Sequence, residues 1–225
     1  MGMGLPLVSV PVLAGFVGVE QAVLIMIIPS VVLNVYPAWT HRDGAGELPE
    51  IKRILIGALP GAISGAAVLQ FASDRFLSTA LALWIFAYLG FRLVHPNFRL
   101  STKFRQRWSP LVGAVAGALQ ASSGISAPII APYVNAVRLR PQGYVFAVCT
   151  CFASFATAHL AVVIFAGILD RETMIQGLLA IVPAIFFIPV GQSARRFVSP
   201  AIFDLFIRIM LAVMGCRLIY TEWVS

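Results

Sequence analysis

Six long apolar segments recur along the chain and are separated by short polar stretches. They cover residues 20–40, 51–71, 77–95, 142–167, 173–192 and 200–221. Each is close to the ~20 residues that an α-helix needs to cross a hydrocarbon core ~30 Å thick. No segment alternates apolar and polar residues as a barrel strand does. The pattern therefore predicts an integral membrane protein built from spanning helices.

Two further apolar stretches are interrupted. Within residues 110–136 the break consists of Ala121, Ser122, Ser123, Gly124, Ile125, Ser126, Ala127 and Pro128. At 1.5 Å per residue, the arm from Pro110 to Gln120 covers only about half of a bilayer. Residues 1–18 resemble the second part of the same unit, with Gly2, Gly4, Pro6 and Pro11 near its start.

This similarity indicates an internal repeat with a period of about 120 residues. Gly2 and Pro6 are spaced as Gly124 and Pro128 are, and Pro60 has a counterpart in Pro183. We therefore divide the chain into a first repeat (1–98), a basic cytoplasmic linker (99–109) and a second repeat (110–225). The leading arm of the first hairpin is missing from this sequence, which begins at the tip, so either an upstream start is not included or the arm is absent in this protein.

Charge indicates the topology. The stretch from Arg92 to Trp108 carries five Lys or Arg residues and no acid, so the positive-inside rule places it in the cytoplasm. If residues 110–136 crossed the membrane completely, every later charged loop would violate the rule. If they form a re-entrant hairpin, Arg138 and Arg140 lie inside, and Asp170 and Glu172 lie outside.

Each half then contains one broken, re-entrant hairpin and three transmembrane helices. An odd number of crossings places the second half upside down relative to the first. The predicted fold is an all-α polytopic helix bundle of two inverted-topology repeats, an architecture common among secondary transporters.

Composition narrows the possible functions. Hydrophobic residues make up 60% of the 225-residue chain and charged residues 11%, whereas soluble domains carry about a quarter charged residues. The net charge of +7 lies in short loops and on no aromatic-interleaved face, so nucleic acid is not an expected partner. We find no nucleotide-binding loop, metal-ligand set or catalytic constellation, and predict neither an enzyme nor a cofactor.

The hairpin tips are the main candidate site. Irregular backbone at membrane depth persists only where protein or a water-filled cavity satisfies it, and free N–H groups at helix N-termini attract anions. An alternative is a Gly/Ser kink that only packs helices. The expected substrate-binding residues are Gly2, Gly4, Asn34, Ser122, Ser123, Gly124 and Ser126.

His159 is a candidate coupling residue, because a neutral histidine within a span can carry a proton. A packing role is the alternative. Gly57, Gly61 and Gly65 form one ridge of small residues, and Gly113 and Gly117 form another. Such ridges allow two helices to approach closely.

Residues 2–11, Gly-Met-Gly-Leu-Pro-Leu-Val-Ser-Val-Pro, resemble the glycine-rich opening of the sulfite exporter family, TauE/SafE, also called the toluene sulfonate uptake permease family. Residues 29–34 with Trp39 and Arg42 resemble its first-half continuation. Residues 117–132 resemble the repeated motif of its second half. The second tip, Ser-Ser-Gly-Ile-Ser, departs from the family's glycine run.

The resemblance implies a secondary transporter, an exporter of small sulfur-containing anions such as sulfite or organosulfonates. It also implies the bacterial cytoplasmic (inner) membrane, with the anion bound near the midplane between the two tips. Alternatives are a carrier of another small anion such as a carboxylate, and a non-transporting membrane subunit. The expected partners are the anion and the lipid bilayer, and a homodimer is conceivable for so small a chain.

Overall fold

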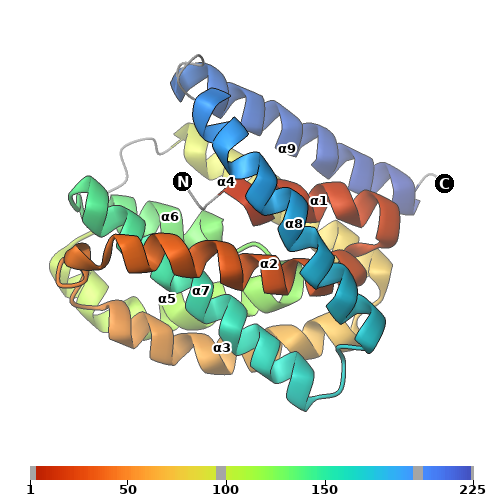
Figure 1. The fold of residues 1–225 in the computed structure, drawn as a ribbon, viewed down its shortest axis with the longest axis horizontal. Helices are drawn as coiled ribbons and strands as arrows, with labels where there is room; N and C mark the ends of the chain where they lie inside the picture. The colour runs from red at the N-terminus through yellow and green to blue at the C-terminus, as the bar shows by residue number, and fades with distance from the viewer. Residues whose placement is uncertain (1–3, 95–99, 195–199, 224–225) are drawn as a thin grey trace.

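The computed structural model describes residues 4–94, 100–194 and 200–223, and these ranges fold into helices without a strand. The helices are α1 (Gly4–Val17), α2 (Val19–Thr40), the 3-10 helix η1 (Arg42–Gly44), α3 (Ile51–Phe71), α4 (Asp74–Val94), α5 (Thr102–Ser123), α6 (Ala127–Asn135), α7 (Pro141–Phe165), α8 (Arg171–Ala194) and α9 (Pro200–Trp223). The predicted all-helical class is confirmed for this part of the chain (Figure 1).

Three of the described helices, α2, α3 and α7, are long and apolar enough to cross a membrane by length and composition. The six predicted spans correspond to α2, α3, α4, α7, α8 and α9, with bounds that differ by a few residues. The structure thus supports a multi-pass membrane protein. One expectation is corrected: the stretch before Trp108 is not all loop. Ser101 caps α5 by accepting a hydrogen bond from the Phe104 amide at 3.3 Å, so α5 begins at Thr102.

Among the described residues, most Lys and Arg side chains lie at one end of the bundle, which we call the basic end. It comprises the α2–α3 connection with the start of α3 (residues 41–53), the start of α5 and the α6–α7 turn (residues 136–140). Ion pairs join these three segments: Glu50 to Arg105 at 3.3 Å and Glu47 to Arg140 at 2.7 Å. Because both ends of the α5–α6 unit bind the same short connection, this unit returns to the end where it starts.

The opposite end holds the starts of α2, α4 and α8. Gln21 Nε2 donates to Thr173 Oγ1 at 2.9 Å and to Gln176 Oε1 at 3.1 Å, which joins α2 to α8. Asp170 precedes α8 and accepts a hydrogen bond from the Thr173 amide at 2.8 Å. Hydrogen bonds from Thr173 hold the pKa of the exposed Asp170 carboxyl below its usual value. Arg217, near the end of α9, donates to Gly15 O at 2.9 Å.

Helices α3 and α5 lie side by side along their length and run in the same direction (Figure 1). The glycine ridge of α3 lies against α5 in constant register, with Gly57, Gly61 and Gly65 facing the backbone of Pro110, Ala114 and Ala118. Gly113 and Gly117 of α5 face the backbone of Ile54 and Ala58. The predicted role of both ridges in close packing is confirmed.

Two hydrophobic clusters stabilise the bundle. The basic-end cluster includes Leu48, Ile54, Ala116, Ile130 and Phe155. The opposite-end cluster includes Val10, Val23, Leu69, Ala121 and Val163. Helices α3, α5 and α7 contribute to both clusters, so the boundary between the clusters crosses the middle of these helices.

Candidate functional site

The α5–α6 break begins with a left-handed glycine. Gly124 has φ +69° and its N–H donates to Gln120 O at 2.9 Å, which ends α5. A left-handed residue at this position is typical of helix C-termini and favours glycine. Pro128 then occupies the first turn of α6, where a missing N–H removes no helical hydrogen bond. The predicted interruption of residues 110–136 is therefore a helix–break–helix unit.

Three consecutive backbone amides at the break lack an acceptor. Among the residues that the structure describes, the N–H groups of Ile125, Ser126 and Ala127 donate to no carbonyl or side chain. All three residues are buried, with exposed fractions of 1%, 2% and 7%. Buried amides are almost always paired with protein, water or a ligand. The N-terminus of α6 thus presents unsatisfied donors in the interior of the protein, which is the electrostatic arrangement that favours an anion.

A hydrogen bond between two side chains crosses the break. Ser126 Oγ donates to Gln120 Oε1 at 2.7 Å, and both residues are buried. Ser126 is the N-cap residue of α6, yet its side chain caps no amide of that helix. Its hydroxyl donates to Gln120 across the break. The Ser126 hydroxyl oxygen accepts no hydrogen bond from the first turn of α6, where the Ala127 amide stays free and the Ile129 amide donates to the Ser126 carbonyl.

Gln120, Ser126 and His159 occupy the boundary between the two hydrophobic clusters. On α5, Gln120 lies between Ala116 of the basic-end cluster and Ala121 of the opposite-end cluster. Ser126 lies between Ile125 and Ala127, which also belong to different clusters. On α7, His159 lies one helical turn after Phe155 of the basic-end cluster and one turn before Val163 of the opposite-end cluster. The middle of the bundle therefore contains a buried polar layer.

His159 is fully buried, and both of its ring nitrogens lack a hydrogen-bond partner within the described part of the chain. Two unsatisfied nitrogens in an apolar interior are unfavourable. A water molecule, a ligand or a rearranged side chain would have to satisfy these nitrogens.

The structure brings some of the predicted site residues together and separates others. Ser122 and Ser123 end α5 beside Gly124, but Ser123 Oγ donates to Leu119 O at 2.7 Å within its own helix. Gly4 is the first described residue of α1, and Gly2 lies outside the described residues.

Asn34 is distant from the break. A Cβ atom placed on Gly124 would lie 3.6 Å from Val23 Cγ2, so the break lies beside Val23 on α2. Asn34 comes eleven residues later on that helix, which corresponds to about 16 Å. Its Nδ2 donates to Ser30 O at 2.8 Å, while its Oδ1 has no partner among the described residues.

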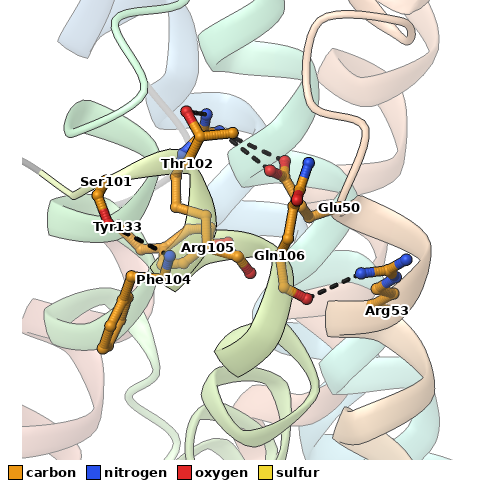
Figure 2. A network of polar contacts seen from close by, with 8 residues as sticks. All are labelled: Glu50, Arg53, Ser101, Thr102, Phe104, Arg105, Gln106 and Tyr133. Atoms are coloured by element: carbon orange, nitrogen blue, oxygen red, sulfur yellow. Dashed lines mark hydrogen bonds and ion pairs between the residues drawn. The ribbon is translucent and has the colours of Figure 1, made fainter.

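A polar network holds the start of the hairpin (Figure 2). The Arg105 guanidinium reaches Glu50, and Arg53 Nη1 donates to Gln106 O at 2.8 Å. Tyr133 of α6 donates its hydroxyl to Arg105 O at 3.4 Å. The Glu50 and Arg105 side chains are only 5% and 13% exposed. These contacts fix the start of α5 to the start of α3 and join the α6 arm to α5, and therefore position the break.

Across the described residues, no group of three or more His, Cys, Asp or Glu side chains is placed to hold a metal ion. The polar layer consists of amides, a hydroxyl and an imidazole. The described part of this layer holds donors for an anion without a fixed positive charge.

Fold and site together define a multi-pass helical membrane protein whose interior holds an interrupted helix with free amide donors. The chain belongs to the sulfite exporter TauE/SafE family, whose model matches residues 1–218. Searches of curated proteins and of solved structures found no match. The family comprises membrane transporters of the sulfite or sulfonate exporter type.

Proposed function

We propose that the protein is a secondary transporter that exports small sulfur-containing anions across the bacterial cytoplasmic membrane. The anion binds at the α5–α6 break, near the middle of the bundle. The observation that carries this proposal is the set of three free, buried amides of Ile125, Ser126 and Ala127. Gly124 precedes them with a left-handed backbone, and Ser122 and Ser123 flank the same break. Gly2 and Gly4 of the first tip complete the site in this proposal.

We further propose that the two repeats are related by inverted topology, as residues 1–98 and 110–225 joined by the basic linker 99–109. Helix directions support this. Helix α2 ends at the basic end, where α7 begins, and α3 begins at that end, whereas α8 begins at the opposite end. Helix α4 starts near Gly18 at the opposite end, where α9 finishes beside Gly15. Equivalent helices thus point in opposite directions, as alternating-access carriers with inverted repeats require.

The orientation in the membrane follows from charge in this proposal. The basic end carries eight described Lys and Arg side chains, namely Arg42, Lys52, Arg53, Lys103, Arg105, Arg107, Arg138 and Arg140. The positive-inside rule assigns this end to the cytoplasm. A substrate at the break would then reach the cytoplasm past the two ion pairs at this end. Asn34, with its free Oδ1, lies on the cytoplasmic side of the break and is the proposed second contact along the route.

A thermal-shift panel on the purified protein in detergent tests the substrate class. It includes sulfite, sulfate, thiosulfate, taurine, sulfoacetate, isethionate, lactate and chloride. An anion present at 100 times its dissociation constant is expected to add about 2.7 kcal/mol to the free energy of unfolding. We expect a sulfur-containing anion to raise the melting temperature and the Gly124→Leu variant to abolish that shift. A leucine at Gly124 would contact Val10, whose Cγ2 already lies 2.8 Å from the position of a Cβ atom.

Gly167 provides a matched control. It has the same φ of +69°, but a side chain there would meet no atom within 4 Å. Gly167→Leu should therefore carry the same backbone strain and retain the anion response. Gly124→Asn, which tolerates a left-handed backbone, serves if Gly124→Leu does not fold. If lactate alone raises the melting temperature, the protein is a carrier of carboxylates on the same scaffold. No shift with any anion would favour a non-transporting membrane subunit.

His159 is the proposed coupling group, because its unpaired nitrogens lie in the same polar layer as the break. We expect His159→Leu to abolish anion transport driven by a pH gradient in proteoliposomes. Exchange of internal for external anion should continue, since the amides of the break remain. Unchanged pH-driven transport in this variant would return His159 to a packing role.

A further inference from the structure

Gln120 offers two donors beside the free amides of α6. Its Oε1 accepts the Ser126 hydroxyl proton, which fixes the orientation of the carboxamide. No described residue accepts a hydrogen bond from its Nε2. The residue is 4% exposed. The two Nε2 protons, on a residue that is almost entirely buried, are therefore available to a ligand or to water.

The carboxamide and the free amides belong to one place in the fold. Gln120 lies one turn before the end of α5, and its bond to the N-cap residue of α6 spans the break. Nε2 is bonded to the same carbon atom as Oε1, so the Oε1–Ser126 hydrogen bond holds Nε2 close to the N-cap residue of α6. Donors therefore come from two directions: from the backbone of Ile125, Ser126 and Ala127, and from the side chain of Gln120.

We infer that Gln120 contacts the bound anion directly and is the residue that distinguishes three-oxygen anions, such as sulfite and sulfonates, from carboxylates. This inference rests on the proposed function of the break. A carboxylate presents two oxygens in one plane, which the backbone amides of the α6 N-terminus can occupy alone. A sulfo group presents a third oxygen outside that plane. The Nε2 protons of Gln120 supply a donor for this third oxygen.

Specificity in this arrangement comes from donors that only one class of anion satisfies. With a sulfo group bound, the Nε2 protons are paired. With a carboxylate bound, they find no acceptor on the ligand, and a donor left unpaired in the site weakens binding of the wrong anion. The site therefore discriminates without a charged side chain.

Methanesulfonate and acetate are matched probes, because they differ only in the acidic group. Dissociation constants for both anions are measured on the full-length protein in detergent, by thermal shift over a concentration series. For wild type we expect methanesulfonate to bind more tightly. Gln120→Met removes the donors at similar volume, and should weaken methanesulfonate by about tenfold or more while acetate changes little. The preference between the two anions then disappears.

Two further variants separate direct contact from a positioning role. Ser126→Ala breaks the Gln120–Ser126 hydrogen bond but retains the Nε2 donors, so most of the preference should persist. Gln106→Met, on an exposed turn of the same helix, is the matched control and should behave as wild type. Gln120→Leu replaces Gln120→Met if that variant does not fold.

The outcomes are distinct. Equal loss of preference in Gln120→Met and Ser126→Ala would show that Gln120 acts only by holding Ser126, which overturns the inference. Retained preference in Gln120→Met would also overturn it, and the proposed function would stand. If wild type binds neither anion nor any sulfur anion of the panel, the proposed function itself fails.

Discussion

Gly61→Ala is expected to force α3 and α5 apart and to destabilise the protein strongly. A Cβ atom at this position would overlap the Ala114 carbonyl oxygen and would lie 2.8 Å from the Ala114 carbonyl carbon and 2.9 Å from the Ala118 nitrogen. These are backbone atoms of a helix, so no rotamer change relieves the overlap. Overpacking of a tight core usually costs about 1–3 kcal/mol. We expect the loss here to reach or exceed the upper part of that range, measured by SDS titration and by the melting temperature in detergent.

Gly90→Ala is the matched control for this prediction. Gly90 also lies within a helix, α4, but a Cβ atom there would meet nothing within 4 Å. Removing a helical glycine where space is open stabilises a helix by up to about 1 kcal/mol. The two Gly→Ala substitutions should therefore shift the melting temperature in opposite directions. If Gly61→Ala unfolds like wild type, the parallel contact between α3 and α5 is not as close as described.

The two glycine ridges could be predicted as packing surfaces from their spacing of four residues, but their pairing could not. Small residues every four positions place a groove on one face of a helix, and this is a local property of the sequence. Which helix fills the groove depends on topology. The parallel alignment of Gly57 with Pro110 follows from the path of the chain through α4 and back to the basic end.

The break in the second hairpin was also predictable, because Gly124 and Pro128 act locally on the backbone. The hydrogen-bond partners of the side chains at the break could not be predicted. The Ser126 hydroxyl could have capped α6, as serine often does at this position. It donates to Gln120 across the break, and this contact depends on the tertiary placement of α5 against α6. Gln120 therefore gave only a weak signal in the sequence.

Asn34 shows why the depth of a polar residue within a span is difficult to predict from the sequence. A buried amide side chain in a span is polar enough to suggest a substrate contact. Hydropathy gives its depth only approximately, and the contact of Gly124 with Val23 places the break about 16 Å away along α2. Polar residues in separate spans join one site only if their depths match, and depth depends on how far each helix extends beyond the membrane.

Arg105→Met is expected to be the most destabilising change at the basic end, with a loss of about 3–5 kcal/mol. This is the usual consequence of removing one partner from a buried ion pair, because the remaining charge stays in a poorly solvated position. The Glu50 side chain is 5% exposed, so it cannot recover its hydration without local unfolding. The loss should appear in SDS titration and as a lower melting temperature. Since Arg105 anchors the first turn of α5, the anion response of the break should weaken in parallel.

A double-mutant cycle identifies the cause. Glu50→Gln combined with Arg105→Met removes both charges, and we expect the double variant to be more stable than Arg105→Met alone. Arg140→Met is the matched control at the second ion pair of the hairpin. The Arg140 side chain is 74% exposed, and exposed pairs contribute about 0–1 kcal/mol. Equal losses for Arg105→Met and Arg140→Met would contradict the argument, because the prediction depends on the deeper burial of both partners of the Glu50–Arg105 pair.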